Sequence, residues 1–521
     1  MIDSMTCVAR VLVVDNDPQT CHDLHDLLAP HGYEVYTVAG GEGDIVAVAL
    51  DVARQRRPHV VVIDLRLQDD YLDEYSGLDI LHRIRPAHAI LYSAYLTADA
   101  IHEARELLYD WVRKHDAAVV LRNTLRKAAA EKSAVASGIE VHWPVDVDPA
   151  TLACAIADAA LPTPPAATLD DVVVQLCPQA RQVRLQPLRR TQSAPSGASR
   201  TRSAVFLLQQ DDRQPAVLKF GRSQQIQAEQ ANYRQYIQQR FPGPYSAQPM
   251  SAVEFWDIGG VTYTFVGTGV ESLPTFSDFY HRTQEPAAIL APLRFFFEDV
   301  WGAYYRAVEP LAEHSLFEAY DRLFGLRKQE QGLRTLYNSL FHAGVVTHNH
   351  NPSTWMLRHA EESRLPNLRQ AVTHGDLHGD NLFVDGERAW VIDFERAGPG
   401  HILRDFAELE VDILTRLLSW ETVDEAAVSA LAARLYQGLT QDQIEPLSLP
   451  AAEPPDVHKA HAVVTGLRQI ARKVTDFEPV EYGWSVLADA LFAASITQAP
   501  PAQRRRAMIV STLVCECLQQ R

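Results

Sequence analysis

The segment 372–395, VTHGDLHGDNLFVDGERAWVIDFE, constrains this chain more than any other part of its sequence. Asp376 and Asn381 stand in the order His-x-Asp-x-x-x-x-Asn, and Asp385-Gly386 predicts a hairpin that returns the chain to Asp393. Two carboxylates and an amide oxygen would then meet in one place. Phosphoryl transfer needs a carboxylate that orients the attacking hydroxyl and oxygen ligands that hold Mg²⁺. The segment therefore favours that chemistry, with Asp376 facing the acceptor.

This pattern, HGDLHGDN followed by a hairpin and IDF, resembles the aminoglycoside phosphotransferase and choline kinase group, which has a protein-kinase-like fold. The resemblance is sharp over about 372–409 and diffuse over the rest of 181–521. It implies ATP and Mg²⁺ as cofactors and a hydroxyl acceptor that the sequence does not identify. It also implies roles for five residues: Asp376 as the catalytic base, Asn381 and Asp393 as Mg²⁺ ligands, and His374 and Asp405 as supports of the catalytic loop.

The same fold should supply a lysine on a strand and a glutamate on the helix that follows. In AVLKF, Lys219 has the apolar neighbours Val217 and Leu218, and Glu229 lies ten residues further on, in IQAEQANYRQYI. In this fold a Lys–Glu pair holds the α- and β-phosphates of ATP. Lys219 and Glu229 are the candidates, although Glu229 could instead belong to a solvated helix face.

Two further elements of the nucleotide site follow from fold analogy. A phosphate-covering loop should lie between the first two strands of the lobe, where SAPSGASRTRS (193–203) contains Gly197 and other small residues. The hinge after the last strand, Phe265-Val266-Gly267, is expected to bind adenine through its backbone. Gly197 and Val266 are thus predicted to contact the nucleotide.

Residues 1 to about 132 alternate strand and helix patterns, and Val60–Ile63 is a β-branched run that suits a buried parallel strand. Repeated βα units predict a parallel sheet with helices on both faces, and ligands bind at the carboxyl ends of its strands. A carboxylate among oxygen ligands can hold Mg²⁺ and accept a phosphoryl group, whose oxygens a hydroxyl and an ammonium can bind. Groups of these kinds follow four predicted strands: Asp15 and Asn16, Asp64, Ser93, and Lys114.

The stretches VLVVDNDP, VVVIDLRL, AILYSAY and DWVRKHD resemble the receiver domain of response regulators over about 8–130. The resemblance implies a histidine kinase as phosphodonor and a dimer formed through this domain. It assigns Asp64 as the phosphoacceptor, Asp15, Asn16 and Asp64 as the Mg²⁺ site, Ser93 and Lys114 as switch partners, and Trp111 as the switch aromatic. Two features depart from the family: Asn16 replaces an acid, and an acidic loop (68–74) follows Asp64. A receiver used only for docking is the alternative.

The predicted fold is an α/β receiver with a five-stranded, doubly wound parallel sheet, joined to an α+β bilobal kinase-like domain. Gly259-Gly260 predicts the turn of a hairpin between strands at 252–257 and 261–266. A proline-rich break, LPTPPAATLDD (161–171), marks a linker that also holds a short helix. The predicted divisions are the receiver (1–132), the linker (133–180), the N-lobe (181–272) and a mostly helical C-lobe (273–521).

Composition narrows the classes of partner. The chain has 48 Lys+Arg against 66 Asp+Glu, a net charge of −18, so a broad nucleic-acid-binding surface is not expected. We expect a cytoplasmic protein with no membrane partner, since the sequence shows neither a signal-peptide pattern nor an apolar run of about 20 residues. Two alternatives to a small-molecule kinase stay open: a catalytically silent nucleotide-binding module that docks partners, and a kinase with a protein acceptor.

Overall fold

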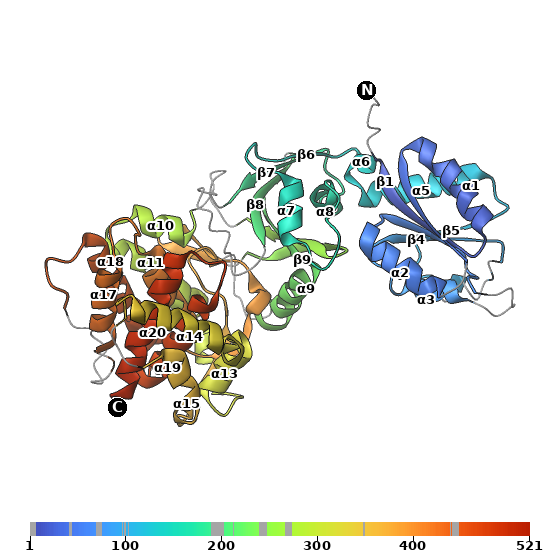
Figure 1. The fold of residues 1–521 in the computed structure, drawn as a ribbon. Helices are drawn as coiled ribbons and strands as arrows, with labels where there is room; N and C mark the ends of the chain where they lie inside the picture. The colour runs from blue at the N-terminus through green and yellow to red at the C-terminus, as the bar shows by residue number, and fades with distance from the viewer. Residues whose placement is uncertain are drawn as a thin grey trace. The chain divides into compact units, whose positions relative to one another are not determined.

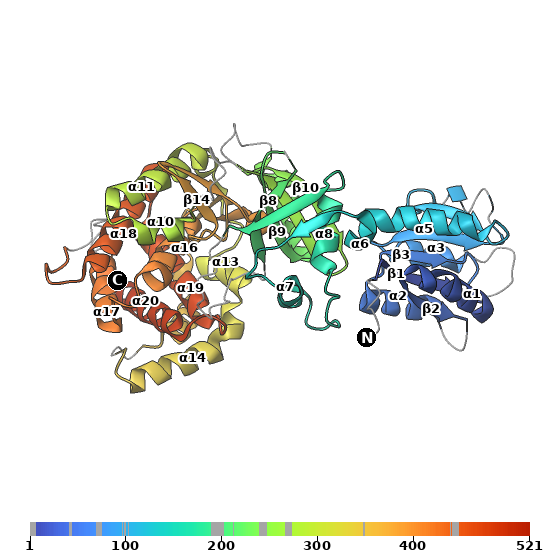
Figure 2. The same ribbon diagram turned by 90° about the horizontal axis from the view of Figure 1, so that it is seen from above.

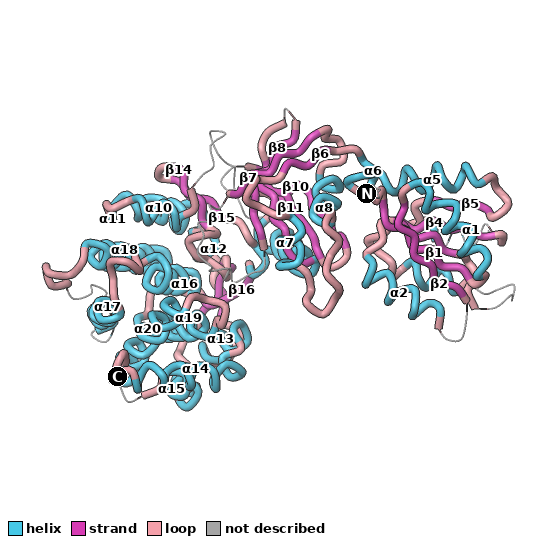
Figure 3. Tube along the Cα trace, turned by 45° about the horizontal axis from the view of Figure 1, so that its top comes forward, coloured by secondary structure: helices cyan, strands magenta, loops and turns pink. Residues whose placement is uncertain are grey.

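The computed structural model of the 521-residue chain forms two compact units. The first unit comprises residues 1–187, 202–227 and 249–265, and the second comprises 188–201, 228–248 and 266–521 (Figure 1). Strands are concentrated in the first unit, whereas helices dominate the second (Figure 3). The structure describes residues 7–40, 44–68, 75–95, 97, 101–102, 104–188, 203–211, 213–238, 247–265, 274–346, 350–437, 439 and 448–520.

The amino-terminal part of the first unit is the predicted parallel sheet. Its strands run in the order β2-β1-β3-β4-β5, which confirms a five-stranded doubly wound arrangement. Val11 of the central strand β1 pairs with Val35 of β2 on one side and with Val60 of β3 on the other. The strands are β1 (Ala9–Asp15), β2 (Tyr33–Ala39), β3 (Val60–Ile63), β4 (His88–Ser93) and β5 (Asp110–Arg113).

Helices cover both faces of this sheet because its central strands are apolar on both sides (Figures 1 and 2). Val11 and Val13 belong to the core shared with α1 (Pro18–Leu28) and α5 (Ala118–Lys132). Leu12 and Val14 belong to the opposite core, under α2 (Ile45–Arg56) and α3 (Ser76–Leu81). Strands β1, β3 and β4 each contribute buried residues to both cores, and the carboxyl ends of the strands are left for polar groups.

A second sheet in the first unit has six strands in the order β10-β11-β9-β8-β7-β6. The five strands from β7 to β11 are antiparallel, and α9 (Ser223–Asn232) follows β9, as a kinase-like N-lobe requires. A π-helical turn, η2 (Tyr233–Ile237), extends α9. The strands are β6 (Glu140–His142), β7 (Gln182–Pro187), β8 (Ala204–Gln210), β9 (Ala216–Arg222), β10 (Pro249–Phe255) and β11 (Ile258–Thr264).

The segment 133–180, for which we predicted a linker, supplies part of the N-lobe. Its strand β6 pairs in parallel with β7, and α7 (Pro149–Ile156) confirms the expected short helix. A further helix, α8 (Thr168–Leu176), buries Leu169, Val172 and Val173 in the same core as Phe220 of β9 and Ile258 of β11. We propose that the kinase-like lobe begins near residue 139, ahead of the proline-rich break.

The hairpin predicted at Gly259-Gly260 was placed wrongly, because both glycines lie inside β11. Phe255 pairs with Ile258, so the turn is at Trp256-Asp257, with φ of 60° at Trp256. Gly260 is needed for packing: a Cβ there would lie 2.8 Å from Val172 Cγ1 and 3.0 Å from Leu176 Cδ1 of α8. A close helix–strand approach, invisible in the local sequence, accounts for the glycine.

The second unit is mostly helical, as predicted, with short strands around the catalytic segment. None of the described helices is long and apolar enough to cross a membrane. Its strands are β12 (Glu309–Pro310), β13 (Arg369–Thr373), β14 (Leu382–Asp385), β15 (Arg388–Val391) and β16 (Gly398–His401). Its α-helices are α10 (Phe276–Arg282), α11 (Pro286–Arg294), α12 (Gly302–Arg306), α13 (Leu316–Phe324), α14 (Leu326–His342), α15 (Pro352–Arg358), α16 (Arg404–Asp412), α17 (Glu425–Gln437), α18 (Pro455–Val474), α19 (Pro479–Ser495) and α20 (Pro501–Gln519).

We expect Gly260→Ala to lower the free energy of unfolding of the first unit by about 1–3 kcal/mol, because the added methyl group overpacks the contact with α8. Gly332→Ala is the control, since a Cβ at this position of α14 meets nothing within 4 Å. That substitution should stabilise the chain by about 0.5–1 kcal/mol. Urea unfolding measures both effects, and a Gly260→Ala chain as stable as the parent would contradict the packing argument.

Candidate active site

The catalytic loop, defined here as residues 374–381, joins β13 to the β14–β15 hairpin. The turn predicted at Asp385-Gly386 is confirmed, with φ of 61° at Gly386. The hairpin returns the chain so that the Ile392 N–H donates to the Asn381 carbonyl oxygen, at 3.1 Å. Asp393 is the next residue, so this backbone bond sets it beside Asn381. The sequence separation of twelve residues thus becomes spatial proximity.

Three polar side chains of this region are buried: Asp376 is 1% exposed, Asn381 0% and Asp393 2%. The Asn381 Nδ2 donates to the Asp376 carbonyl oxygen at 2.9 Å, so Asn381 Oδ1 is its atom that could ligate a cation. Asp393 has φ of 75°, a left-handed conformation that non-glycine residues rarely adopt outside functional sites. Carboxylate and amide oxygens are hard ligands, and they fit Mg²⁺.

The backbone of the catalytic loop is held by three acids on one face of α16. Asp405 accepts hydrogen bonds from the N–H groups of His374 and Gly375, both at 2.9 Å. Glu408 accepts from the Leu377 N–H at 2.9 Å, and Asp412 accepts from the Gly379 N–H at 2.8 Å. The spacing i, i+3, i+7 puts the three carboxylates along one side of a helix. Buried N–H groups that lack secondary-structure partners thereby gain charged acceptors.

Cations on the same helix and its extension balance two of these acids. Arg404 Nε donates to Glu408 at 2.9 Å, and Arg416 Nε donates to Asp412 at 2.6 Å. Burial and the neighbouring Glu408 raise the pKa of Asp405, whereas Arg416 outweighs burial and lowers the pKa of Asp412. Tyr305 supplies the third acid with a hydroxyl donor, at 2.8 Å from Asp405.

His374 connects the catalytic loop to the strand that precedes Asp393. Its Nε2 lies 3.0 Å from the Ile392 carbonyl oxygen, and its ring packs near Trp301 and Phe394. One side chain thus links the two segments that carry Asp376 and Asp393. The role of His374 as a support of the catalytic loop stays a prediction, and this contact is compatible with it.

Several residues near the loop were missed by the sequence reasoning. Arg396 places a guanidinium nitrogen 3.6 Å from Asp376 Oδ1, and Arg416 contacts Asp380 at 3.0 Å as well as Asp412. Glu408 and Asp412 could have been found from the spacing of acids in RDFAELEVD, which repeats at helical intervals after Asp405.

The predicted nucleotide-contacting residues are distributed over both units. Lys219 is buried in the middle of β9, opposite Val261 of β11, in the first unit. Glu229 is fully buried in the second unit, and its Oε1 accepts the Phe394 N–H at 3.2 Å. This burial rules out a solvated helix face for Glu229. Gly197 and Val266 lie outside the described residues.

The second candidate site lies at the carboxyl ends of the parallel strands. Lys114 Nζ lies 2.5 Å from Asp64 Oδ2 and 2.7 Å from Asp15 Oδ2. Burial raises the pKa of Asp15, and it opposes the charge on Lys114, but hydrogen bonds to both carboxylates prevail and raise the pKa of Lys114. The ammonium lies between two carboxylates, so the negative charge of this site attracts a cation.

The remaining predicted receiver residues lie on the strands of this sheet or directly after them. Ser93 is fully buried at the end of β4, where its carbonyl oxygen accepts the Lys114 N–H at 3.2 Å. Trp111 on β5 is 46% exposed. Asn16 is half-buried after Asp15. Among the described residues, no three His, Cys, Asp or Glu side chains form a metal-holding group, so a divalent ion at either site would need amide oxygens, phosphate or water as further ligands.

With this geometry in place, comparison with known proteins bears on both halves of the chain. A family described as "Ternary complex associated domain 9" matches residues 348–497, which contain the catalytic loop and α16. The transcriptional regulatory protein TcrX of Mycobacterium tuberculosis is 37% identical over 94 residues, which are 18% of this chain and 36% of that protein. The chain therefore spans about a third of the length of the curated relatives it matches.

Two solved structures resemble parts of this chain. The chemotaxis protein CheY4 of Vibrio cholerae is 20% identical, with 23% of this chain and 98% of that chain covered and a TM-score of 0.20. The amicoumacin kinase hAmiN, solved with AMP-PNP, Ca²⁺ and Ami, is 10% identical, with 64% of this chain and 88% of that chain covered and a TM-score of 0.35. By its own topology, this chain combines a receiver-like domain with a kinase-like domain.

We expect Asp405→Ala to lower the free energy of unfolding of the second unit by about 3 kcal/mol, because two buried N–H groups lose acceptors worth about 1–3 kcal/mol each. Asp405→Asn keeps one acceptor oxygen and the side-chain volume, so it should cost about half as much. Chemical denaturation followed by tryptophan fluorescence measures both. Equal stability of the alanine variant and the parent would show that α16 does not hold the loop.

Proposed function

We propose that this chain is a cytoplasmic signalling enzyme that transfers a phosphoryl group from ATP to a hydroxyl acceptor, with Mg²⁺ as cofactor, under the control of its receiver domain. The observation that carries the proposal is the arrangement of Asp376, Asn381 and Asp393. Burying two carboxylates and an amide at the end of one loop costs free energy that an apolar core would avoid, so we take the set as functional. A core built only for stability would have no need of this set.

Each residue then has a defined task. Asp376 orients the acceptor hydroxyl and takes its proton as the oxygen attacks the γ-phosphorus, while the bond from that phosphorus to the β,γ-bridging oxygen breaks and ADP leaves. Asn381 and Asp393 are the residues that would hold Mg²⁺, which neutralises charge on the phosphate oxygens. Lys219 and Glu229 are proposed to serve the nucleotide phosphates, together with Gly197 and Val266. Arg396 lies at the catalytic base, where its positive charge would face phosphoryl oxygens.

A second candidate function is a catalytically silent module that binds nucleotide and docks partners. The matched family's description, "Ternary complex associated domain 9", favours it, because that description concerns assembly. Asn16 also favours it, since an amide replaces a charged ligand in the receiver. The buried set at the catalytic loop is the reason we prefer an enzyme. A kinase with a protein acceptor would use the same residues. ATP turnover measured with candidate small-molecule and protein acceptors separates these two kinds of kinase.

We expect Asp393→Ala to abolish binding of Mg²⁺-ATP, because the nucleotide phosphates lose the cation that neutralises them. Asp376→Ala should leave that binding within about threefold of the parent and remove phosphoryl transfer, because it contacts the acceptor rather than the nucleotide. Isothermal titration calorimetry and ATP turnover, with and without candidate acceptors, measure the two effects. Both variants binding Mg²⁺-ATP like the parent would contradict this division of roles.

We also expect the receiver to respond to beryllofluoride with Mg²⁺, a stand-in for a phosphoryl group on Asp64. Trp111 fluorescence and kinase activity should change together, and both changes should vanish in Asp64→Asn. Because Asn16 lacks a charge, the response should need more Mg²⁺ than it does in Asn16→Asp. A response seen only in Asn16→Asp would mean that the natural receiver serves for docking alone.

A further inference from the structure

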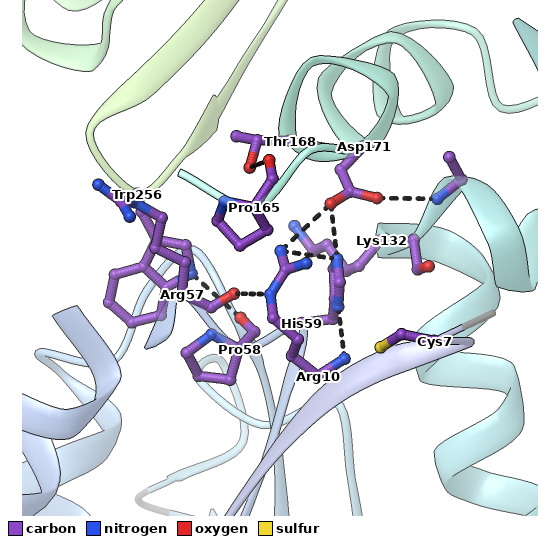
Figure 4. Close-up of polar contacts among 12 residues, drawn as sticks. Cys7, Arg10, Arg57, Pro58, His59, Lys132, Pro165, Thr168, Asp171 and Trp256 are labelled. Carbon is purple, nitrogen blue, oxygen red and sulfur yellow. Dashed lines mark hydrogen bonds and ion pairs between the residues drawn. The ribbon is translucent and has the colours of Figure 1, made fainter. Parts of the chain in front are cut away.

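The amino-terminal edge of the receiver sheet is the end at which its parallel strands begin. It carries a largely buried polar cluster that joins the receiver to the N-lobe within the first unit (Figure 4). We call Arg10, Arg57, His59, Asp171 and Asp257 the anchor cluster. The first three belong to the receiver, at the start of β1 and before β3. Asp171 lies on α8, and Asp257 lies in the turn between β10 and β11. This edge is opposite the one that holds Asp64.

Asp171 is the acceptor for three donors. Its Oδ2 lies 3.2 Å from Arg10 Nη2 and 2.8 Å from His59 Nε2, and its Oδ1 accepts the Ala134 N–H at 3.0 Å. The Arg10 backbone N–H donates to His59 Nδ1 at 2.9 Å, so Nδ1 carries no proton. His59 is therefore neutral and donates its Nε2 proton to Asp171. The side chains of Arg10, His59 and Asp171 are almost fully buried.

Arg57 makes the second half of the anchor cluster. Its Nε and Nη2 lie 2.7 and 3.2 Å from the two carboxylate oxygens of Asp257, and its Nη1 donates to the Pro162 carbonyl oxygen at 2.9 Å. Next to this pair, the Trp256 indole N–H donates to the Pro58 carbonyl oxygen at 3.0 Å. A paired guanidinium that is completely buried cannot separate from its carboxylate without a large desolvation penalty.

The anchor cluster adjoins β3, the strand that leads to Asp64, and β11, the strand that pairs with β9 at Lys219. On the receiver side, the four residues of β3 separate His59 from Asp64. On the N-lobe side, the Trp256-Asp257 turn begins β11, and Val261 of β11 pairs with Lys219 of β9. Helix α8, which carries Asp171, packs against Gly260 of the same strand. Contiguous, packed elements therefore run from Asp64 to Lys219.

We infer that the amino-terminal edge of the receiver is a permanent docking surface for the chain's own N-lobe, and that it couples the state of the Asp64 pocket to the strand that carries Lys219. The part of this inference that concerns nucleotide rests on the proposed function. The receiver acts as a structural member of the N-lobe. It differs in this from a domain that docks and releases, because the buried Arg10, Arg57, His59 and Asp171 and the partly buried Asp257 lose contacts when the surfaces part.

The docking surface is tested by hydrogen exchange on the full chain without nucleotide. In Arg57→Gln, amides of the Trp256-Asp257 turn and of α8 should exchange at least about tenfold faster, because the partly buried Asp257 loses its cation. The matched control is Arg54→Gln, an exposed position on the last turn of α2, which should behave like the parent. The docking surface is overturned if exchange in Arg57→Gln equals that of the parent, or if Arg54→Gln changes exchange by the same amount.

The coupling is tested by adding beryllofluoride and Mg²⁺ to the parent and to Asn16→Asp, again without ATP. Exchange in peptides from β9 and β11 should change along with peptides around Asp64, and Arg57→Gln should abolish only the N-lobe change. Receiver peptides that respond alone, or a response in neither chain, overturn the coupling. Because no nucleotide is present, a chain that lacks kinase activity would still give the expected result, so failure of the proposed function is distinguishable.

Discussion

The hydrogen bonds from the catalytic loop to the acids of α16 are the interaction on which the candidate active site depends. Four backbone N–H groups between residues 374 and 379 point into the protein core, where water cannot satisfy them. Asp405, Glu408 and Asp412 accept all four. Without these acceptors the loop could not remain buried, and Asp376 and Asn381 would not be held at defined positions.

Helix α16 can perform this task because charge is balanced on its other sides. All nine of its residues are buried. Arg404 and Arg416 pair with Glu408 and Asp412, and Glu410, on a different face, binds Arg468 of α18 at 2.6 and 2.9 Å. Buried carboxylates are tolerated only when donors and cations surround them. The helix is thus fixed to the C-lobe on one side and presents its acids to the loop on the other.

The two ends of the parallel sheet in the first unit carry different polar groups with different roles. The carboxyl ends of the strands gather Asp15, Asp64 and Lys114 into a pocket. The amino-terminal edge provides Arg10 and His59 for contacts with α8, which itself lies under the N-lobe sheet. A strand of four buried residues, β3, joins the two edges. This arrangement explains why residues 133–180 are folded: a flexible connection could not keep Asp171 in a buried site.

The sequence by itself determined the features that depend on local pattern. β-Branched runs and polar residues after them predicted the parallel sheet and its pocket, and HGDLHGDN with a hairpin and IDF predicted the catalytic segment, because turn chemistry and strand period act over a few residues. Only the tertiary structure decided the roles of Gly260, Glu408 and Asp171. Each of these depends on a partner far away in the chain: a helix that approaches a strand, a loop whose N–H groups need acceptors, and a receiver edge that needs a counter-charge. Such needs arise only when distant segments pack together and exclude water, so a local pattern can place Glu408 on the same helix face as Asp405 but cannot name the partner of any of the three.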